Sequence, residues 1–215
     1  MTASPRVLLA EPDRPTRAGL RIALARGGVE VTDEAIDGGA AVDAALAGRP
    51  DVAIVAAELP GGGLEAVRKI AAGAPRVRVV FLTGRPSGDE LVEAVLAGAV
   101  GYLSRDVDAD RLPEILRAVL AGEIALPRRY SQHLVDALRR RDVRRGRLAA
   151  RTDARLTDRE WEVLEMLAED LSTAEIGRRL GISAVTARRH IASLVSKLGV
   201  ADRAGAAELL RRSEG

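Results

Sequence analysis

The sequence predicts a doubly wound α/β domain with a five-stranded parallel sheet, followed by a small all-α domain. Over residues 1–121, five short apolar runs alternate with stretches of helical period, as in a chain that returns to a parallel sheet through helices. Near the other end, residues 171–197 read as two short helices joined by a glycine turn. A length of 215 residues is sufficient for both domains.

The α/β domain is expected to follow a regular order. Its strands are predicted at 6–10, 29–36, 51–57, 77–82 and 101–103, and its helices at 16–25, 40–47, 64–72, 90–97 and 110–121. The third run, DVAIVAA, is almost continuously apolar, which is typical of a central strand buried on both faces. Parallel sheets place functional groups at the carboxyl ends of their strands. Those ends carry Glu11, Ala56, Glu58, Thr83 and Arg105.

A connecting segment is expected between the domains, so that the chain divides into residues 1–121, 122–153 and 154–215. Residues 130–141 have the apolar spacing of a helix, and arginines crowd the part that follows. Residues 122–155 carry 10 basic and 4 acidic side chains, although the net charge of the chain is only +2. A charge run is typical of a flexible, solvated linker. A basic tether can also add non-specific phosphate contacts, and we favour this second interpretation.

Capping signals place the helices of the last domain. Two patterns of the S/T-x-x-E type start helices, Thr157 with Glu160 and Ser172 with Glu175. Gly181 should end the second of these helices, because glycine enters the left-handed conformation at little cost. Ser183 begins the next helix, whose apolar side is expected to hold Val185, Ile191, Leu194, Val195 and Leu198. A last helix is expected at 201–212.

The segment Leu156–Val200 resembles the LuxR-type helix-turn-helix of the NarL/FixJ response regulators, which are transcription regulators of two-component systems. The matching stretches, in unbroken register, are LTDREWEVLEMLAEDLSTAEIGRRLGIS and TARRHIASLVSKLGV. A basic, hydroxyl-rich second helix after a tight turn is typical of a helix that reads DNA. The resemblance implies that the protein binds double-stranded DNA as a homodimer, on two related half-sites.

The same resemblance assigns residues to this interface. Arg188 and Arg189 stand where family members read base edges, and arginine suits guanine because it can donate to O6 and N7 together. The residues expected to position the phosphate backbone are Thr173, Thr186, His190, Ser193 and Lys197. Ala192 occupies a position that is often basic in relatives, so readout there is expected to be weaker or apolar. The dimerising residues would be Ala204, Ala207 and Leu210.

Residues 5–121 resemble a receiver domain, which has a flavodoxin-like fold. The matching motifs are VLLAEPD, PDVAIVAAELPGG, VVFLTG and AGAVGYLSRD. A receiver accepts phosphate on an aspartate after its third strand and holds magnesium with an acidic pair after its first strand. Position by position, the aspartate falls on Ala56 and the acidic pair falls on Glu11 and Pro12. Asp13, the next residue, is a candidate for partial substitution of the missing ligand.

The other pocket positions are partly kept. The receiver's hydroxyl is kept as Thr83, and its lysine is replaced by Arg105. Tyr102 corresponds to the aromatic residue that moves with the hydroxyl in such domains. Ordinary packing is an equally open role for Thr83 and Tyr102. An alanine methyl group cannot attack a phosphoryl group, and Pro12 removes an oxygen ligand that a hard cation needs. We therefore expect a degenerate receiver without aspartyl phosphorylation. Glu58 is expected to be a solvated loop charge.

Composition narrows the function further. The chain has no cysteine and only two histidines, His133 and His190, so we expect no metal site and no cofactor. No nucleophile has a partnered base, which argues against an enzyme. No signal peptide or membrane span is evident, so a cytoplasmic location is expected. Two alternatives to a phosphorylation-independent regulator stay open: a small-molecule sensor that gates DNA binding, and a protein-interaction module that sequesters another regulator.

Overall fold

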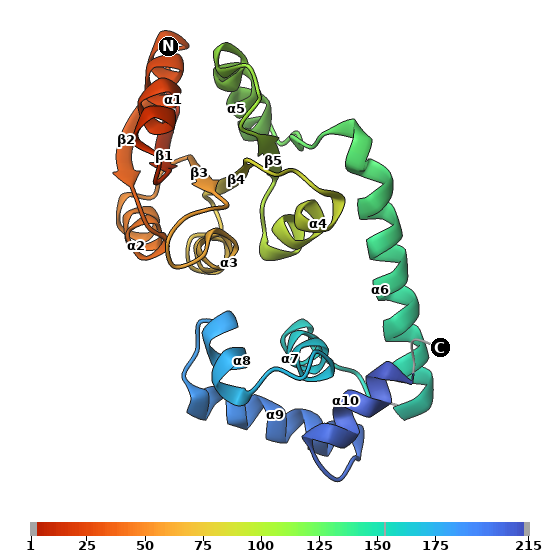
Figure 1. Cartoon of the computed structure of the whole chain (residues 1–215). Coiled ribbons are helices and arrows are strands. Elements are labelled where there is room, and N and C mark those ends of the chain that lie inside the picture. Colours follow the sequence, from red (N-terminus) through yellow and green to blue (C-terminus); the bar gives the residue numbers. More distant parts are fainter. Residues whose placement is uncertain (1–3, 153, 213–215) are drawn as a thin grey trace. The chain divides into compact units, whose positions relative to one another are not determined.

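The computed structural model describes residues 4–152 and 154–212. They form two compact units, which divide between Val135 and Asp136. The first unit is a five-stranded parallel α/β domain and the second is all-helical (Figure 1), so the predicted fold class is confirmed. Among the described residues, no helix combines the length and the apolar character that a membrane crossing requires.

The sheet of the first unit has the order β2-β1-β3-β4-β5, and all neighbouring strands run parallel. Its strands are β1 (Arg6–Ala10), β2 (Glu30–Ala35), β3 (Val52–Ala56), β4 (Arg78–Thr83) and β5 (Gly101–Ser104). The connecting helices are α1 (Arg14–Arg26), α2 (Gly38–Gly48), α3 (Gly63–Gly73), α4 (Gly88–Ala97) and, after the short η1 (Ala109–Arg111), α5 (Leu112–Leu120). Their ends differ from the expected ones by no more than about two residues, the usual uncertainty of an element boundary.

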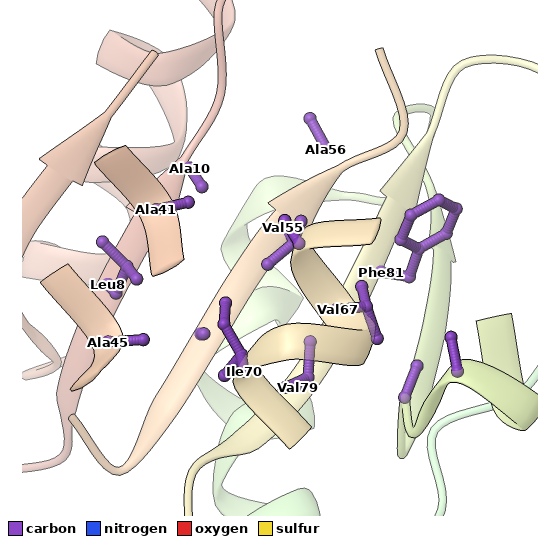
Figure 2. Packing of buried hydrophobic residues seen from close by; sticks show 14 of the residues in the cluster. Leu8, Ala10, Ala41, Ala45, Val55, Ala56, Val67, Ile70, Val79 and Phe81 are labelled. Carbon is purple, nitrogen blue, oxygen red and sulfur yellow. The ribbon is translucent and has the colours of Figure 1, made fainter. Parts of the chain in front are cut away.

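Helices cover both faces of this sheet. Helices α2, α3 and α4 pack on one face, and α1 and α5 pack on the other (Figure 1). All of β3 is buried, as its continuous apolar run predicts. Figure 2 shows the cluster under α2 and α3, which includes Leu8, Val55, Ile70 and Phe81. Ala56 lies at the end of this cluster, where β3 reaches the carboxyl edge of the sheet.

The connecting segment is largely helical. After η2 (Arg128–Tyr130), helix α6 (Ser131–Thr152) continues for 22 residues. The sequence predicted a helix over 130–141, and in the structure this helix continues through the arginine-rich residues that follow, as far as Thr152. Arginine and alanine are good helix formers, and together they outweigh the single glycine, Gly146. Tyr130 of η2 and Leu134 at the start of α6 belong to the first unit and pack against its core.

The second unit packs four helices and the end of α6 around one core. Its helices are α7 (Asp158–Ala168), α8 (Thr173–Arg179), α9 (Ala184–Leu198) and α10 (Arg203–Arg211). Leu148 of α6 is buried in this core. One turn earlier, the Arg145 guanidinium lies over the Trp161 ring, 5.5 Å from its centroid, and pairs with Asp158 at 2.7 Å. Residues 145–148 are therefore part of the folded unit.

Candidate DNA-binding interface and the altered acidic pocket

Helices α8 and α9 are joined by a tight turn. Ser172 and Glu175 form the expected capping box, with the Ser172 N–H donating to the Glu175 carboxylate at 2.8 Å and the Glu175 N–H donating to Ser172 Oγ at 3.3 Å. Gly181 has a φ of +63°, in the left-handed region. At Gly177 the backbone of the turn approaches closely, since a Cβ there would lie 3.0 Å from the Ile182 carbonyl oxygen. The turn therefore fixes where α9 begins.

Helix α9 buries one side and exposes the other. Ser183 accepts a hydrogen bond from the Thr186 N–H at 3.1 Å and so begins the helix. The buried side consists of Ala187, Ile191, Leu194 and Leu198. Val185 was expected on this side, but it is 68% exposed. It precedes Ala187 by two residues, which places it about 200° around the helix axis, on the outer side.

The basic side chains of α9 fall into two groups. Arg188 and Arg189 are exposed, and neither makes an ion pair or hydrogen bond within the described part of the chain. Lys197 instead pairs with the buried Glu160 carboxylate at 2.8 Å. Burial acts to raise the pKa of Glu160, but hydrogen bonds from Lys197 and Thr157 outweigh it and hold that pKa below its usual value. The two arginines are thus free to meet a polyanion, whereas Lys197 is engaged within the fold.

The remaining residues expected to contact DNA carry hydroxyl or imidazole groups. Thr186 and Ser193 are exposed on α9, and His190 is half-buried beside them. The Thr186 hydroxyl lies 2.9 Å from Ser183 Oγ. Thr173, at the start of α8, accepts a hydrogen bond from Arg203 at 3.4 Å. Six of the seven expected DNA contacts therefore belong to one helix, α9.

The expected dimerising residues differ in exposure. Ala204 is exposed, but Ala207 and Leu210 are buried in the core of their own unit, where α10 packs against α7. Leu210 is only 1% exposed. The apolar side of this short helix packs inside its own unit. Ala207 and Leu210 are therefore not exposed for a contact between two chains, which is what the sequence suggested. A contact through α10 has to use its outer side, which includes Ala204.

An ion bridge with one fully buried carboxylate occupies the acidic pocket of the first unit. Arg105 Nη2 lies 2.9 Å from Glu11 Oε2 and 3.0 Å from Glu58 Oε2. Glu11 is fully buried, and its burial raises the pKa of its carboxyl group while Arg105 acts to lower it. Glu58 also accepts a hydrogen bond from the Gly84 N–H at 3.1 Å. Glu58 is thus an exposed loop charge, as the sequence suggested, but it is held by Arg105 and Gly84.

The two residues after Glu11 supply no further carboxylate to this bridge. Pro12 has no side-chain oxygen. The Asp13 carboxylate caps α1 by accepting from Thr16 N at 2.9 Å and from Thr16 Oγ1 at 2.7 Å. These hydrogen bonds hold the pKa of Asp13 below its usual value. The carboxylate that was the candidate substitute ligand is thus engaged at a helix N-terminus.

The other pocket residues are packed and hydrogen-bonded. Ala56 presents only a buried methyl group at the end of β3 (Figure 2). The Thr83 hydroxyl accepts a hydrogen bond from the Arg85 N–H at 3.1 Å. The Tyr102 ring is buried, and its hydroxyl donates to the Glu90 carboxylate at 2.6 Å. Burial, followed by that hydrogen bond, raises the pKa of Tyr102. These contacts agree with the packing role left open for both residues.

Sequence reasoning missed the close approach at Gly177, the pairing of Glu58 and the exposure of Val185. Gly177 could have been noticed as a glycine within a helical pattern, which often marks close backbone approach. The pairing of Glu58 could have been noticed because Glu58 follows β3 and Arg105 follows β5, and both strands end at the carboxyl edge of the sheet. The exposure of Val185 could have been noticed from helix geometry, which places it about 200° around the axis from Ala187.

Comparison with known families supports both units. Residues 7–117 match the response regulator receiver domain, and residues 154–210 match the luxR family of bacterial regulatory proteins. The transcriptional regulatory protein LiaR of Bacillus subtilis is 32% identical over 97% of each chain. The nitrate/nitrite response regulator protein NarP of Escherichia coli is 32% identical over 99% of this chain and 98% of its own.

Solved structures give the same result for the fold. A two-component response regulator of the LuxR family from Aurantimonas sp. SI85-9A1 has a TM-score of 0.58 and 29% identity, over 62% of this chain and 97% of its own. RcsB from Salmonella typhimurium has a TM-score of 0.57 over 98% of this chain and 100% of its own. At 22% identity, the second likeness concerns the fold alone.

Proposed function

We propose that this chain, which belongs to the response regulators that join a receiver domain to a LuxR-type domain, controls transcription without aspartyl phosphorylation. The chain is a DNA-binding transcriptional regulator of the response-regulator type, a class that is not enzymatic. Its acidic pocket, rather than its DNA-binding domain, departs from the pattern of a phosphorylated regulator.

The Arg105 bridge between Glu11 and Glu58 carries this proposal. A hard divalent cation needs several oxygen ligands, and it would have to displace a guanidinium that already pairs with both carboxylates. Pro12 and Ala56 offer no side-chain oxygen, and Asp13 is engaged by α1. The residues present therefore do not fit a magnesium ion, and no carboxylate stands at position 56 to accept phosphate.

Intact-mass spectrometry tests this proposal directly. The purified chain is treated with acetyl phosphate and magnesium, and we expect no phosphate adduct and no change in DNA affinity. Ala56→Asp alone should restore little, because Arg105 still holds Glu11. Ala56→Asp combined with Pro12→Asp should restore more, and serves as the positive control. A stoichiometric adduct on any receiver residue of the wild-type chain would refute the proposal.

We also propose that the second unit binds DNA as a dimer. The exposed, unpaired Arg188 and Arg189 support a DNA-facing α9, and RcsB, which shares the fold, has been solved as two dimers bound to two parallel DNAs. The outer side of α10 is the surface that we assign to the contact. Ala204→Asp should weaken binding to paired half-sites more than to a single half-site, without changing the unfolding midpoint. Leu210→Asp should unfold the unit, because Leu210 is buried.

The alternatives gain no support from the pocket. A small-molecule sensor would need charged groups there that are free to pair with a ligand, but Arg105 pairs with both Glu11 and Glu58. A module that only sequesters another regulator has no need of two free arginines on α9. Footprinting on the protein's own promoter separates a DNA-binding regulator from such a module. The proposed place of action is the cytoplasm, where bacterial DNA is found.

A further inference from the structure

Val185 is an apolar side chain at an unusual place. It lies in the first turn of α9, where the helix begins after Ser183, and it is 68% exposed. Single exposed apolar residues are common on protein surfaces and need no explanation by themselves. This one stands among the residues that face DNA in the proposed function, so its chemistry bears on what the helix reads.

The helix places Val185 beside the two free arginines. Residues three and four positions apart are neighbours on a helix surface, so Val185, Arg188 and Arg189 share one side of α9. Ala192, also exposed, extends that side by another turn. The opposite side is buried, as described above. The outer side thus presents an uncovered isopropyl group next to two unpaired guanidinium groups.

This combination suits one kind of surface. The major groove of DNA displays guanine O6 and N7, to which arginine donates, and the thymine C5 methyl group, which apolar side chains contact. A wholly apolar partner would leave the guanidinium groups desolvated without acceptors. A polyanion that carries methyl groups satisfies both kinds of side chain at once.

We propose that Val185 is a specificity-determining residue that reads a thymine methyl group near the guanine read by Arg188 or Arg189. The inference rests on the proposed function and adds a sequence preference to it. Three helical residues rise about 4.5 Å, and base pairs are stacked about 3.4 Å apart, so the thymine should lie within one or two steps of that guanine.

Uracil substitution provides the test. A binding site is selected for the full-length protein from random double-stranded DNA, and each thymine of the site is then replaced by uracil, which pairs alike but lacks the methyl group. We expect one thymine per half-site at which uracil weakens wild-type binding about fourfold, the factor for losing one buried methyl-sized group. Val185→Ala should bind the thymine site about as weakly and should not distinguish thymine from uracil there.

A matched variant controls for general effects. Val143 is an exposed valine on α6, outside α9, so Val143→Ala should retain the full thymine preference. Circular dichroism should be unchanged in both variants, because neither side chain is buried. The inference is overturned if no uracil position affects the wild type, or if Val185→Ala remains equally sensitive to uracil. If the wild type selects no site at all, both the inference and the proposed DNA binding fail.

Discussion

At the scale of single residues, Arg105 determines the state of the acidic pocket. Its guanidinium neutralises the fully buried Glu11, whose pKa is raised by burial. A carboxyl group whose pKa is higher in the folded than in the unfolded state contributes stability below its unfolded pKa, and loses that contribution as the pH rises through the folded pKa. Without Arg105, the pKa of Glu11 should rise further.

Arg105→Met should therefore destabilise the first unit in a pH-dependent way. We expect the free energy of unfolding to fall by about 2 kcal/mol at pH 8 and by less at about pH 4.5, because only the ionised form of the buried Glu11 carboxyl group loses a charged partner. Urea unfolding at both pH values measures this. Arg76→Met, at an exposed arginine, is the control. Equal losses at the two pH values would contradict the assigned role.

Arg188 and Lys197 should respond differently to truncation, although both were expected to contact DNA. Arg188→Ala should cost about 1–3 kcal/mol on a selected site and little on random DNA, if the arginine reads a guanine. Lys197→Ala should lower the free energy of unfolding by about 1–3 kcal/mol, because it leaves Glu160 buried without its partner. Titrations on both DNAs and urea unfolding separate the two effects, with Arg76→Ala as the charge control.

At the scale of elements, two glycines should give opposite results. Gly146 lies within α6, and a Cβ added to it would meet nothing within 4 Å, so Gly146→Ala should stabilise the chain by about 0.5–1 kcal/mol. Gly177→Ala should destabilise it, because the new Cβ would press on the Ile182 carbonyl oxygen at 3.0 Å. Thermal unfolding compares the two variants. A loss of stability in Gly146→Ala would contradict the uninterrupted α6.

Local signals explain why most elements could be predicted. The Ser172–Glu175 box and the buried run of β3 depend on neighbours within a few residues, so sequence alone locates them. The bridge from Arg105 to Glu58 spans 47 residues, and it exists only after the sheet brings the strand ends together. The burial of Leu210 likewise follows from packing between α10 and α7, whereas the exposure of Val185 follows from its position about 200° around the helix axis from Ala187.

At the scale of the whole molecule, the extent of the second unit is the testable feature. Leu148 of α6 is 1% exposed in the core of that unit, so a fragment of residues 136–215 should fold alone and bind DNA. A fragment of residues 151–215 should be less stable by about 2–5 kcal/mol, because it lacks Leu148. Urea unfolding compares them, and Leu148→Ala in the longer fragment should reproduce much of the difference. Identical midpoints would show that α6 adds nothing.

The arginine in the acidic pocket also affects how quickly the protein can respond to a signal. A phosphorylated regulator can be switched on and off within the lifetime of a single molecule, as the phosphoryl group is gained and hydrolysed. In the proposed function, a chain whose acidic residues are paired with its own arginine has no such cycle. In the proposed function, the number of copies in the cell then becomes the signal, and the speed of response follows from synthesis, degradation and dilution by growth.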